Sequence, residues 1–369
     1  DGGDCAMWAS AVTCNHYGVC VSNPGSSVSL SCCEVTENAV HGLGASAGGV
    51  ARADKCRMTN NQVGAVARGA TSRLSLSDCH VSSNTRIGVG IREAGSGDCA
   101  GCTIEQNQYG VCALNAGSSI ALSDCSASNN VRYGAASSDG GLVEATGCTL
   151  NGNKQLGAGS WHAGSRVVLR RCRAELNGKT GVACRLGSGV DAEGCNIKGN
   201  EQFGVYVSGE GSKVAAHGCE LSGNSQYGVC AEGGGAAVVR ECGMQKNGQG
   251  GVVSKDTNSK VSLDTCRVTG NGRVGVAGII GGCVMAERCV AEGNEHVGIG
   301  AWHSASVVEL SDCEVLSNGG TGVTAVAGGV LRGGSCTVRS NERFGVVSRD
   351  EGSLVALEKC VLSDNGKLG

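Results

Sequence analysis

Short runs in which apolar and polar residues alternate follow one another along the chain. In residues 259–278 (SKVSLDTCRVTGNGRVGVAG), apolar or small residues occupy every second position in three runs, which contain Val261, Cys266 and Val276. Alternation with a period of two is the pattern of a β-strand with one buried face, and the Asn and Gly residues between the runs are typical of turns. No stretch has a convincing helical period over ten residues, so the pattern predicts an all-β chain with three short strands in each repeat.

Cysteine marks the length of the repeat. Fifteen cysteines follow one another in steps of 23 or 24 residues, and in the second half of the chain the steps alternate, so that two repeats span 47 residues. An asparagine lies five residues after each of these cysteines, and a glycine lies nine residues after thirteen of them. In the other two repeats the glycines, Gly64 and Gly110, come one residue early. Representative repeats are Cys195, Asn200, Gly204; Cys219, Asn224, Gly228; and Cys336, Asn341, Gly345.

Three short strands in each 23- or 24-residue turn, stacked on the next turn, define a right-handed parallel β-helix, a solenoid of about 16 turns. Equivalent residues of neighbouring turns would lie ~4.8 Å apart, the spacing of strands in a sheet. We predict that the cysteines form a ladder of free thiols in the core, where a thiol behaves as a small hydrophobe. We also predict that the asparagines stack at a turn through their amides, and that the glycine starts a strand in a conformation, or at a closeness, that a side chain would forbid.

The repeat resembles the right-handed β-helix repeats of the pectin-lyase-like superfamily, with N-x-x-x-G-V/I turns such as the one in GNEQFGVYV at residues 199–207. The resemblance covers essentially the whole chain. Repeats of this type occur in carbohydrate-active proteins and in substrate-binding regions of some F-box proteins. The resemblance therefore implies the β-helix fold but leaves the activity open, because one such fold hosts many functions. No catalytic motif of that superfamily can be transferred to this sequence residue by residue.

Composition argues against several classes of function. The chain has 369 residues with 64 Gly and 1 Pro, and its net charge is only −3. Such a charge gives no electrostatic reason to expect nucleic acid or an anionic membrane as a partner, and no apolar run is as long as a membrane span. The single CxxC pair, Cys99 and Cys102, lacks the second pair that a zinc site needs. We therefore expect no metal and no cofactor.

The least repetitive positions lie four and five residues after each glycine. On five successive turns they hold the candidate ligand-binding residues Arg92, Glu93, Asn115, Asp139, Trp161, His162 and Arg185. An aromatic ring together with an acid, a His and an Arg could hold a sugar chain or transfer protons; the alternative is a solvated row of mixed loop residues. The pair Trp161–His162 recurs 141 residues later as Trp302–His303, which are candidates too, although internal duplication and packing against a neighbouring loop also explain the second pair.

The two ends of the sequence suggest a wider context. Gly369 is the ninth-residue glycine of its turn, and neither end shows the polar or helical cap that protects the open sheet edges of a solenoid. We expect residues 1–369 to form a single solenoid that is a fragment of a longer chain or a unit that associates end to end. Cys20, Cys112 and Cys230 follow Gly-Val and are expected to be exposed. Exposed thiols favour a reducing intracellular compartment, without excluding an extracellular one.

Three functions remain open on these grounds. The first is a non-enzymatic structural or scaffold solenoid, part of a larger assembly or filament with protein partners or copies of itself, because the repetition is nearly complete. The second is a carbohydrate-binding β-helix with a polysaccharide as partner. The third is a polysaccharide lyase, epimerase or hydrolase. The third is disfavoured, because turns of constant length leave no long loops from which to build a cleft.

Overall fold

The computed structural model describes residues 2–366, which consist of parallel strands and turns without a helix, and hence without a helix that could cross a membrane. The all-β parallel fold predicted from the sequence is confirmed. Contacts divide the chain into two compact units: unit 1 comprises Asp1–Gly178 and Ser188–Asp191, and unit 2 comprises Lys179–Gly187 and Ala192–Gly369. The terminal residues Asp1 and Gly369 lie outside the described residues, so the expectation of one solenoid over residues 1–369 stays a prediction.

Unit 1 holds the first part of three parallel sheets, here called A, B and C after the first, second and third strand of each turn. Its sheet A strands are β1 (Asp4–Trp8), β4 (Ser27–Ser31), β7 (Val50–Asp54), β10 (Arg73–Ser77), β13 (Ser96–Ala100), β16 (Ser119–Ser123), β18 (Leu142–Thr146) and β20 (Arg166–Arg170). Its sheet B strands are β2 (Ala11–Thr13), β5 (Glu34–Thr36), β8 (Arg57–Thr59), β11 (His80–Ser82) and β14 (Thr103–Glu105). Its sheet C strands are β3 (Val19–Ser22), β6 (His41–Ser46), β9 (Val63–Arg68), β12 (Ile87–Arg92), β15 (Tyr109–Leu114), β17 (Tyr133–Ser138) and β19 (Leu156–Trp161).

Unit 2 repeats this arrangement, and β22 (Gly189–Glu193) is divided between the units. The sheet A strands of unit 2 are β25 (Lys213–His217), β28 (Ala236–Arg240), β31 (Lys260–Asp264), β34 (Cys283–Glu287), β37 (Val307–Ser311), β40 (Val330–Gly334) and β43 (Leu354–Glu358). Its sheet B strands are β23 (Asn196–Lys198), β26 (Glu220–Ser222), β29 (Gly243–Gln245), β32 (Arg267–Thr269), β35 (Val290–Glu292), β38 (Glu314–Leu316), β41 (Thr337–Arg339) and β44 (Val361–Ser363). Its sheet C strands are β21 (Thr180–Arg185), β24 (Val205–Ser208), β27 (Tyr227–Glu232), β30 (Gly250–Lys255), β33 (Val274–Ile279), β36 (Val297–Trp302), β39 (Thr321–Val326) and β42 (Phe344–Arg349).

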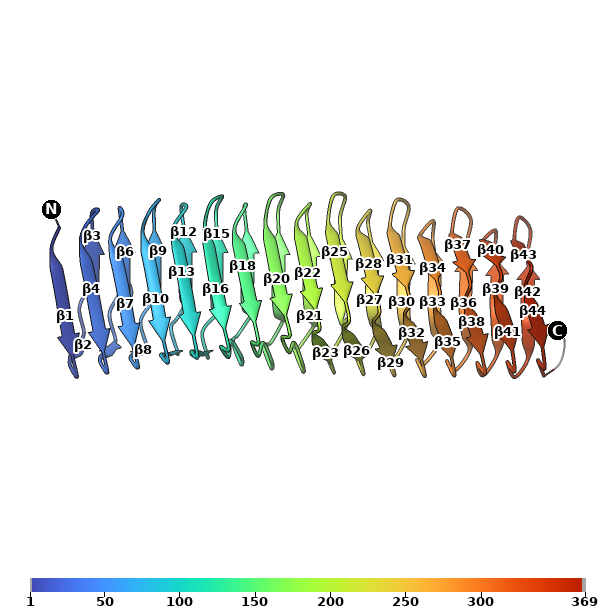
Figure 1. Ribbon diagram of the computed structural model, residues 1–369, viewed down its shortest axis with the longest axis horizontal. Helices are drawn as coiled ribbons and strands as arrows, with labels where there is room; N and C mark the ends of the chain where they lie inside the picture. The colour runs from blue at the N-terminus through green and yellow to red at the C-terminus, as the bar shows by residue number, and fades with distance from the viewer. Residues whose placement is uncertain (1, 367–369) are drawn as a thin grey trace. The chain divides into compact units, whose positions relative to one another are not determined.

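Equivalent strands of successive turns lie side by side within each unit, as the blue and cyan strands β4, β7, β10 and β13 of unit 1 show in Figure 1. The register places each residue opposite its equivalent in the next repeat, for example Leu30 opposite Ala53. Every second residue of a strand therefore points inward at the same height in each turn, and these inward residues are buried. The core is a narrow column of Val, Leu, Ile, Ala and Cys side chains.

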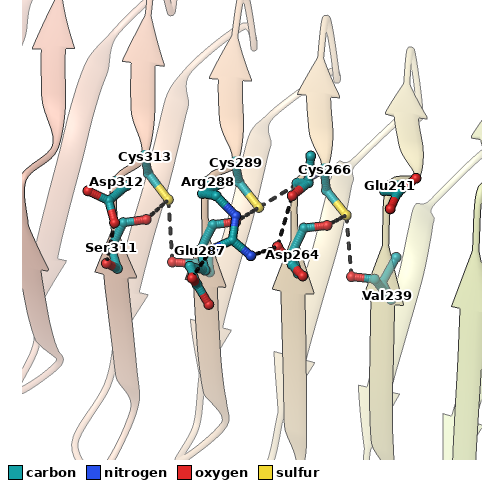
Figure 2. A network of polar contacts seen from close by, with 12 residues as sticks. Val239, Glu241, Asp264, Cys266, Glu287, Arg288, Cys289, Ser311, Asp312 and Cys313 are labelled. Carbon is teal, nitrogen blue, oxygen red and sulfur yellow. Dashed lines mark hydrogen bonds and ion pairs between the residues drawn. The ribbon is translucent and has the colours of Figure 1, made fainter.

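The ladder cysteines lie in this core as predicted, and none of the 24 cysteines, all within the described residues, forms a disulfide bond. The thiol of Cys266 donates to the carbonyl oxygens of Val239 and Asp264, each at 3.4 Å, and Figure 2 shows the same arrangement at Cys313. The backbone N–H of Cys266 lies 3.4 Å from the Sγ of Cys289 in the next turn. The thiol of Cys266 thus fills a small space in the core and forms hydrogen bonds with the backbone, without a disulfide bond.

The asparagine ladder is also confirmed. Asn247 is fully buried, and its Oδ1 accepts hydrogen bonds from the N–H and the Nδ2 of Asn224, both at 3.0 Å. Its own N–H and Nδ2 donate to Oδ1 of Asn271, and Nδ2 also donates to the carbonyl oxygen of Leu221 at 3.1 Å. One side-chain amide therefore satisfies two backbone groups of the preceding turn, in a place that water does not reach.

The glycine of the repeat is required by a close approach and not by its backbone angle. A Cβ atom built on Gly275 would collide with the carbonyl oxygen of Gly298 and lie 2.8 Å from Nδ2 of Asn294. Since Asn294 belongs to the asparagine ladder, the glycine leaves the space that this amide occupies. Of the two reasons predicted for the glycine, the structure shows the close approach and not the backbone conformation.

The corner between a sheet C strand and the next sheet A strand explains the alternation of 23 and 24 residues. Corners of four residues, such as 303–306, alternate with corners of three, such as 280–282. The longer corner ends in a buried serine: Ser306 Oγ accepts the N–H of Gly281 at 2.9 Å and donates to the carbonyl oxygen of Trp302 at 2.6 Å. The shorter corner ends in Gly282, where a side chain would collide with the backbone of Ser254. Gly64 and Gly110 come early in turns with four-residue corners, which keeps those turns at 23 residues.

The prediction of three strands in every turn is wrong for part of unit 1. Sheet B continues after β14 only as isolated bridges at Ser126, Thr149 and Arg173. Side chains replace part of the ladder there, since the N–H of Asn151 donates to Ser128 Oγ at 3.1 Å and the N–H of Glu175 donates to Asn151 Oδ1 at 2.9 Å. The polar side chains thus compete successfully with the backbone partners of a regular strand.

Candidate functional site

The candidate residues lie on the outer face of sheet C and at the corners that follow it. The fourth residue after the glycine is the last residue of the strand, and the fifth is the first residue of the corner. The fifth residues have left-handed backbone angles, with φ from 52° to 73° at Glu93, Asn115, Asp139, His162 and His303. Asn, Asp and Gly are frequent at this position because they tolerate such angles best. Arg185 belongs to unit 2 and is described there, whereas Arg92 to His162 belong to unit 1.

The side chains of Asp139 and His162 contact each other from neighbouring turns of unit 1. His162 Nδ1 lies 2.9 Å from Asp139 Oδ1 and 3.0 Å from Ser138 Oγ, and Ser138 Oγ donates to Asp139 Oδ2 at 2.8 Å. A nucleophilic serine requires the hydroxyl and the carboxylate on opposite ring nitrogens. Here both contact Nδ1 at an exposed corner, so the cluster does not activate Ser138.

Trp161 lies flat on its own strand and stacks on an aromatic ring of the preceding turn. A Cβ atom at Gly159 would overlap the indole, and the ring centroids of Trp161 and Tyr133 are 4.8 Å apart at an angle of 26°. Tyr133 in turn contacts Tyr109 at 5.4 Å, and Arg132 donates to the hydroxyl of Tyr109 at 2.9 Å. The three rings partly cover small residues of the outer face, which include Cys112 and Ala136.

The second tryptophan has different neighbours. Trp302 covers Gly300 as Trp161 covers Gly159, but Val274 stands where unit 1 has Tyr133. Beside Trp302 a groove of about 390 Å³ opens over the outer faces of β27, β30, β33 and β36. Its floor includes Val253 and Ala277.

The two long edges of this groove differ in polarity. Gln249, Arg273 and His296 each stand one residue before a sheet C strand and line one edge, whereas Ile279 and Trp302 end their strands and line the other. Tyr227 lies on the strand farthest from Trp302 among those that line the groove. No carboxylate of the described residues pairs with Arg273, so its guanidinium is available to a bound molecule. His303 is exposed and does not line the groove.

The Asp–His pair is not repeated beside Trp302. Ile279 and Ile280 stand where unit 1 has Ser138 and Asp139. The two Trp–His segments therefore share the packing of the indole over a glycine, but not the polar contacts of the histidine.

Arg185 lies within unit 2 over an aromatic ring. Its guanidinium carbon is 4.7 Å from the ring centroid of Tyr206, whose hydroxyl donates to Glu232. Burial and the hydrogen bond to Glu232 raise the pKa of Tyr206 to about 12. Lys255 Nζ lies 3.9 Å from Glu232. The side chains of this cluster contact one another through the ring and the hydroxyl of Tyr206 and the carboxylate of Glu232, which indicates a structural role.

Two of the three cysteines expected to be exposed are buried. Cys20 is exposed, whereas Cys112 and Cys230 point to the outer face of sheet C and are covered there by neighbouring side chains. Tyr109, Leu114 and Tyr133 pack around Cys112, a covering that sequence alternation alone does not reveal. Burial raises the pKa of Cys112 to about 12, so that its thiol stays protonated at neutral pH.

The outer face of sheet A in unit 2 carries paired charges. Arg288 lies between Asp264 and Glu287, with its Nη2 at 2.6 Å from Asp264 Oδ1 (Figure 2). Arg288 thus bridges the neighbouring carboxylate of its own turn and the carboxylate of Asp264 in the preceding turn. Among residues 2–366 no group of three or more His, Cys, Asp or Glu side chains is placed to hold a metal ion, and this includes Cys99 and Cys102, which are buried free thiols.

The profile of the family described as right-handed beta helix region matches residues 10–150, 114–262 and 204–369. Since these segments cover nearly the whole chain, the protein belongs to the right-handed β-helix family. No curated protein sequence matches the chain significantly.

Solved structures of the same architecture include three carbohydrate-active proteins. The pectate lyase Pel9A is 16% identical over 69% of this chain and 68% of its own, with a TM-score of 0.43. The A-module of the Azotobacter vinelandii mannuronan C-5 epimerase AlgE4 is 12% identical over 93% and 90%, with a TM-score of 0.45. A mannuronic acid specific polysaccharide family 6 lyase from human gut microbiota is 8% identical over 82% and 77%, with a TM-score of 0.46. At these identities the likeness concerns the fold alone.

Proposed function

We propose that this chain is a non-enzymatic scaffold solenoid that carries a carbohydrate-binding site in the groove between Tyr227 and Trp302. The observation that supports the binding site is the groove itself, which combines an apolar floor, aromatic side chains and a polar edge. Its volume falls in the range of small-molecule sites. A sugar ring presents C–H groups on its faces and hydroxyl groups at its rim, so it can stack on Trp302 while it bonds to Gln249, Arg273 and His296.

The scaffold part of the proposal rests on the regular construction of the turns. Every turn from Cys33 onward carries the ladder cysteine and the ladder asparagine, and each corner between a sheet C strand and the next sheet A strand has three or four residues. Association with protein partners or between copies of the chain stays a prediction. We do not propose lyase, epimerase or hydrolase activity, because the acid–histidine pair of the candidate row is exposed.

Trp302→Ala is expected to weaken binding to an oligosaccharide, found by glycan array screening, by about tenfold or more, because it removes the aromatic wall of the groove. Isothermal titration calorimetry measures the dissociation constant. Trp161→Ala is a matched control: it removes the equivalent indole over a glycine, in a place where aromatic rings fill the space. Equal loss of affinity in both variants, or no bound glycan for the wild type, would contradict the proposed site.

A further inference from the structure

Arg92 ends strand β12 of unit 1 and has no hydrogen-bonding partner for part of its side chain. Its Nε is buried and makes no hydrogen bond among the described residues. The nearby carboxylate of Glu93 is already engaged, because Arg68 Nε lies 2.9 Å from both of its oxygens. A buried N–H group of a cation that lacks an acceptor lowers the stability of the folded state, and such groups are rare in native structures.

The surroundings of Arg92 carry an excess of positive charge. Arg68 stands opposite Arg92 in the register of β9 and β12, which places their Cα atoms ~4.8 Å apart. Arg86 lies just before β12, is exposed and has no ion-pair partner among the described residues. Among the described residues, Glu93 is the one carboxylate that pairs with any of these three arginines, in a protein whose net charge is −3. Burial, Arg86 and Arg68 lower the pKa of Arg92, as expected for a cation that lacks a counterion.

The side chain of Arg92 does not fold back over the glycine two residues before it. Gly90 and Arg92 have the same spacing as Gly159 and Trp161, where the long side chain folds back over the glycine. Over Gly90 no atom of Arg92 is near: a Cβ atom there would meet only Ile87 and Val66, at 3.5 Å or more. Arg92 thus does not cover Gly90, which is buried by neighbouring side chains.

We propose that Arg92, with Arg68 and Arg86, forms a binding site for an oxyanion on the outer face of sheet C in unit 1. An oxyanion here means the oxygen-bearing group shared by sulfate, phosphate and carboxylate. Such a group matches the planar donor fork of arginine and supplies the acceptor that Nε lacks. It also offsets the excess of positive charge. This site is independent of the sugar-binding groove proposed for unit 2.

The test is a titration of the full chain with sodium sulfate, sodium phosphate and sodium acetate at constant ionic strength, with chloride as the reference ion. The readout is the ¹⁵Nε–H resonance of Arg92 together with calorimetry. We expect saturable binding of at least one oxyanion with a shift of the Arg92 resonance. The anion that binds most tightly identifies the group: sulfate or phosphate indicates a tetrahedral group, and acetate indicates a carboxylate.

Arg92→Met keeps the aliphatic stem and is expected to weaken this binding by about tenfold or more, because it removes the charge-assisted donors. Arg267→Met is the matched control, since Arg267 is an exposed arginine of unit 2 that already pairs with Glu292 at 3.3 Å; its binding should stay unchanged. Circular dichroism of both variants verifies the fold. The proposal is overturned if no oxyanion binds more tightly than chloride, or if Arg92→Met binds as well as the wild type.

Discussion

Replacing Asn247 by aspartate is expected to lower the free energy of unfolding by about 3 kcal/mol or more. The new side chain has nearly the same shape, but an oxygen replaces Nδ2. In the wild type, Nδ2 donates hydrogen bonds to the carbonyl oxygen of Leu221 and to Oδ1 of Asn271. Two hydrogen bonds are lost, two acceptors face the new oxygen, and a negative charge is placed where the wild-type residue is fully buried. Urea denaturation followed by circular dichroism measures the change.

Asn258→Asp is the matched control, because Asn258 is an exposed corner residue with a left-handed φ of 67° that aspartate tolerates as well. Its free energy of unfolding should change by less than about 0.5 kcal/mol. If Asn247→Asp were as stable as Asn258→Asp, the asparagine ladder would not be a structural element.

Gly275→Ala is expected to lower the free energy of unfolding by about 2–3 kcal/mol, although it adds a single methyl group. The methyl group would overlap the carbonyl oxygen of Gly298 and crowd Nδ2 of Asn294, so either a turn must separate or an asparagine must leave the ladder. The same denaturation experiment measures the effect.

Gly334→Ala provides the comparison, since a Cβ atom there has no neighbour within 4 Å and the backbone angle is ordinary. This variant should be neutral or slightly stabilised, because alanine reduces the entropy of the unfolded chain. Equal stability of the two variants would show that the repeated glycine is not required by close packing.

The repeated features could be predicted from the sequence because each one has the same surroundings in every turn. Cys266 and Asn271 each bond to their own equivalent in the next turn. Gly275 lies against Gly298, its equivalent in the next turn, and against the ladder residue Asn294. When a residue contacts the equivalent residue of the next turn, the same residue type is needed in every turn, so its repetition in the sequence reveals its structural role. The buried serine that ends the longer corners recurs every second turn. The alternation of serine and glycine at this position, as in Ser306 and Gly282, is a sequence signal from which the two kinds of corner could have been predicted.

The candidate site could not be predicted in this way, because it depends on neighbours that differ from turn to turn. Trp161 and Trp302 stand in matching segments, yet one is stacked on Tyr133 and the other borders a groove, since Val274 is smaller. The burial of Cys112 has the same origin, because aromatic side chains from its own and the next turn cover it. Predicting such differences requires the register of the strands, because the register determines which side chains are neighbours on adjacent turns.

Native thiol labelling tests most directly the central claim that the repeated cysteines are structural. The folded chain is treated with iodoacetamide, and the labelled residues are read by mass spectrometry. We predict rapid labelling of the exposed Cys5, Cys14, Cys20 and Cys32, and protection of the fourteen ladder cysteines from Cys33 to Cys336, all of which are buried. Labelling needs an accessible thiolate, which burial denies. Ladder thiols that react as fast as Cys14 in the folded chain, or that are found as disulfides, would contradict the account.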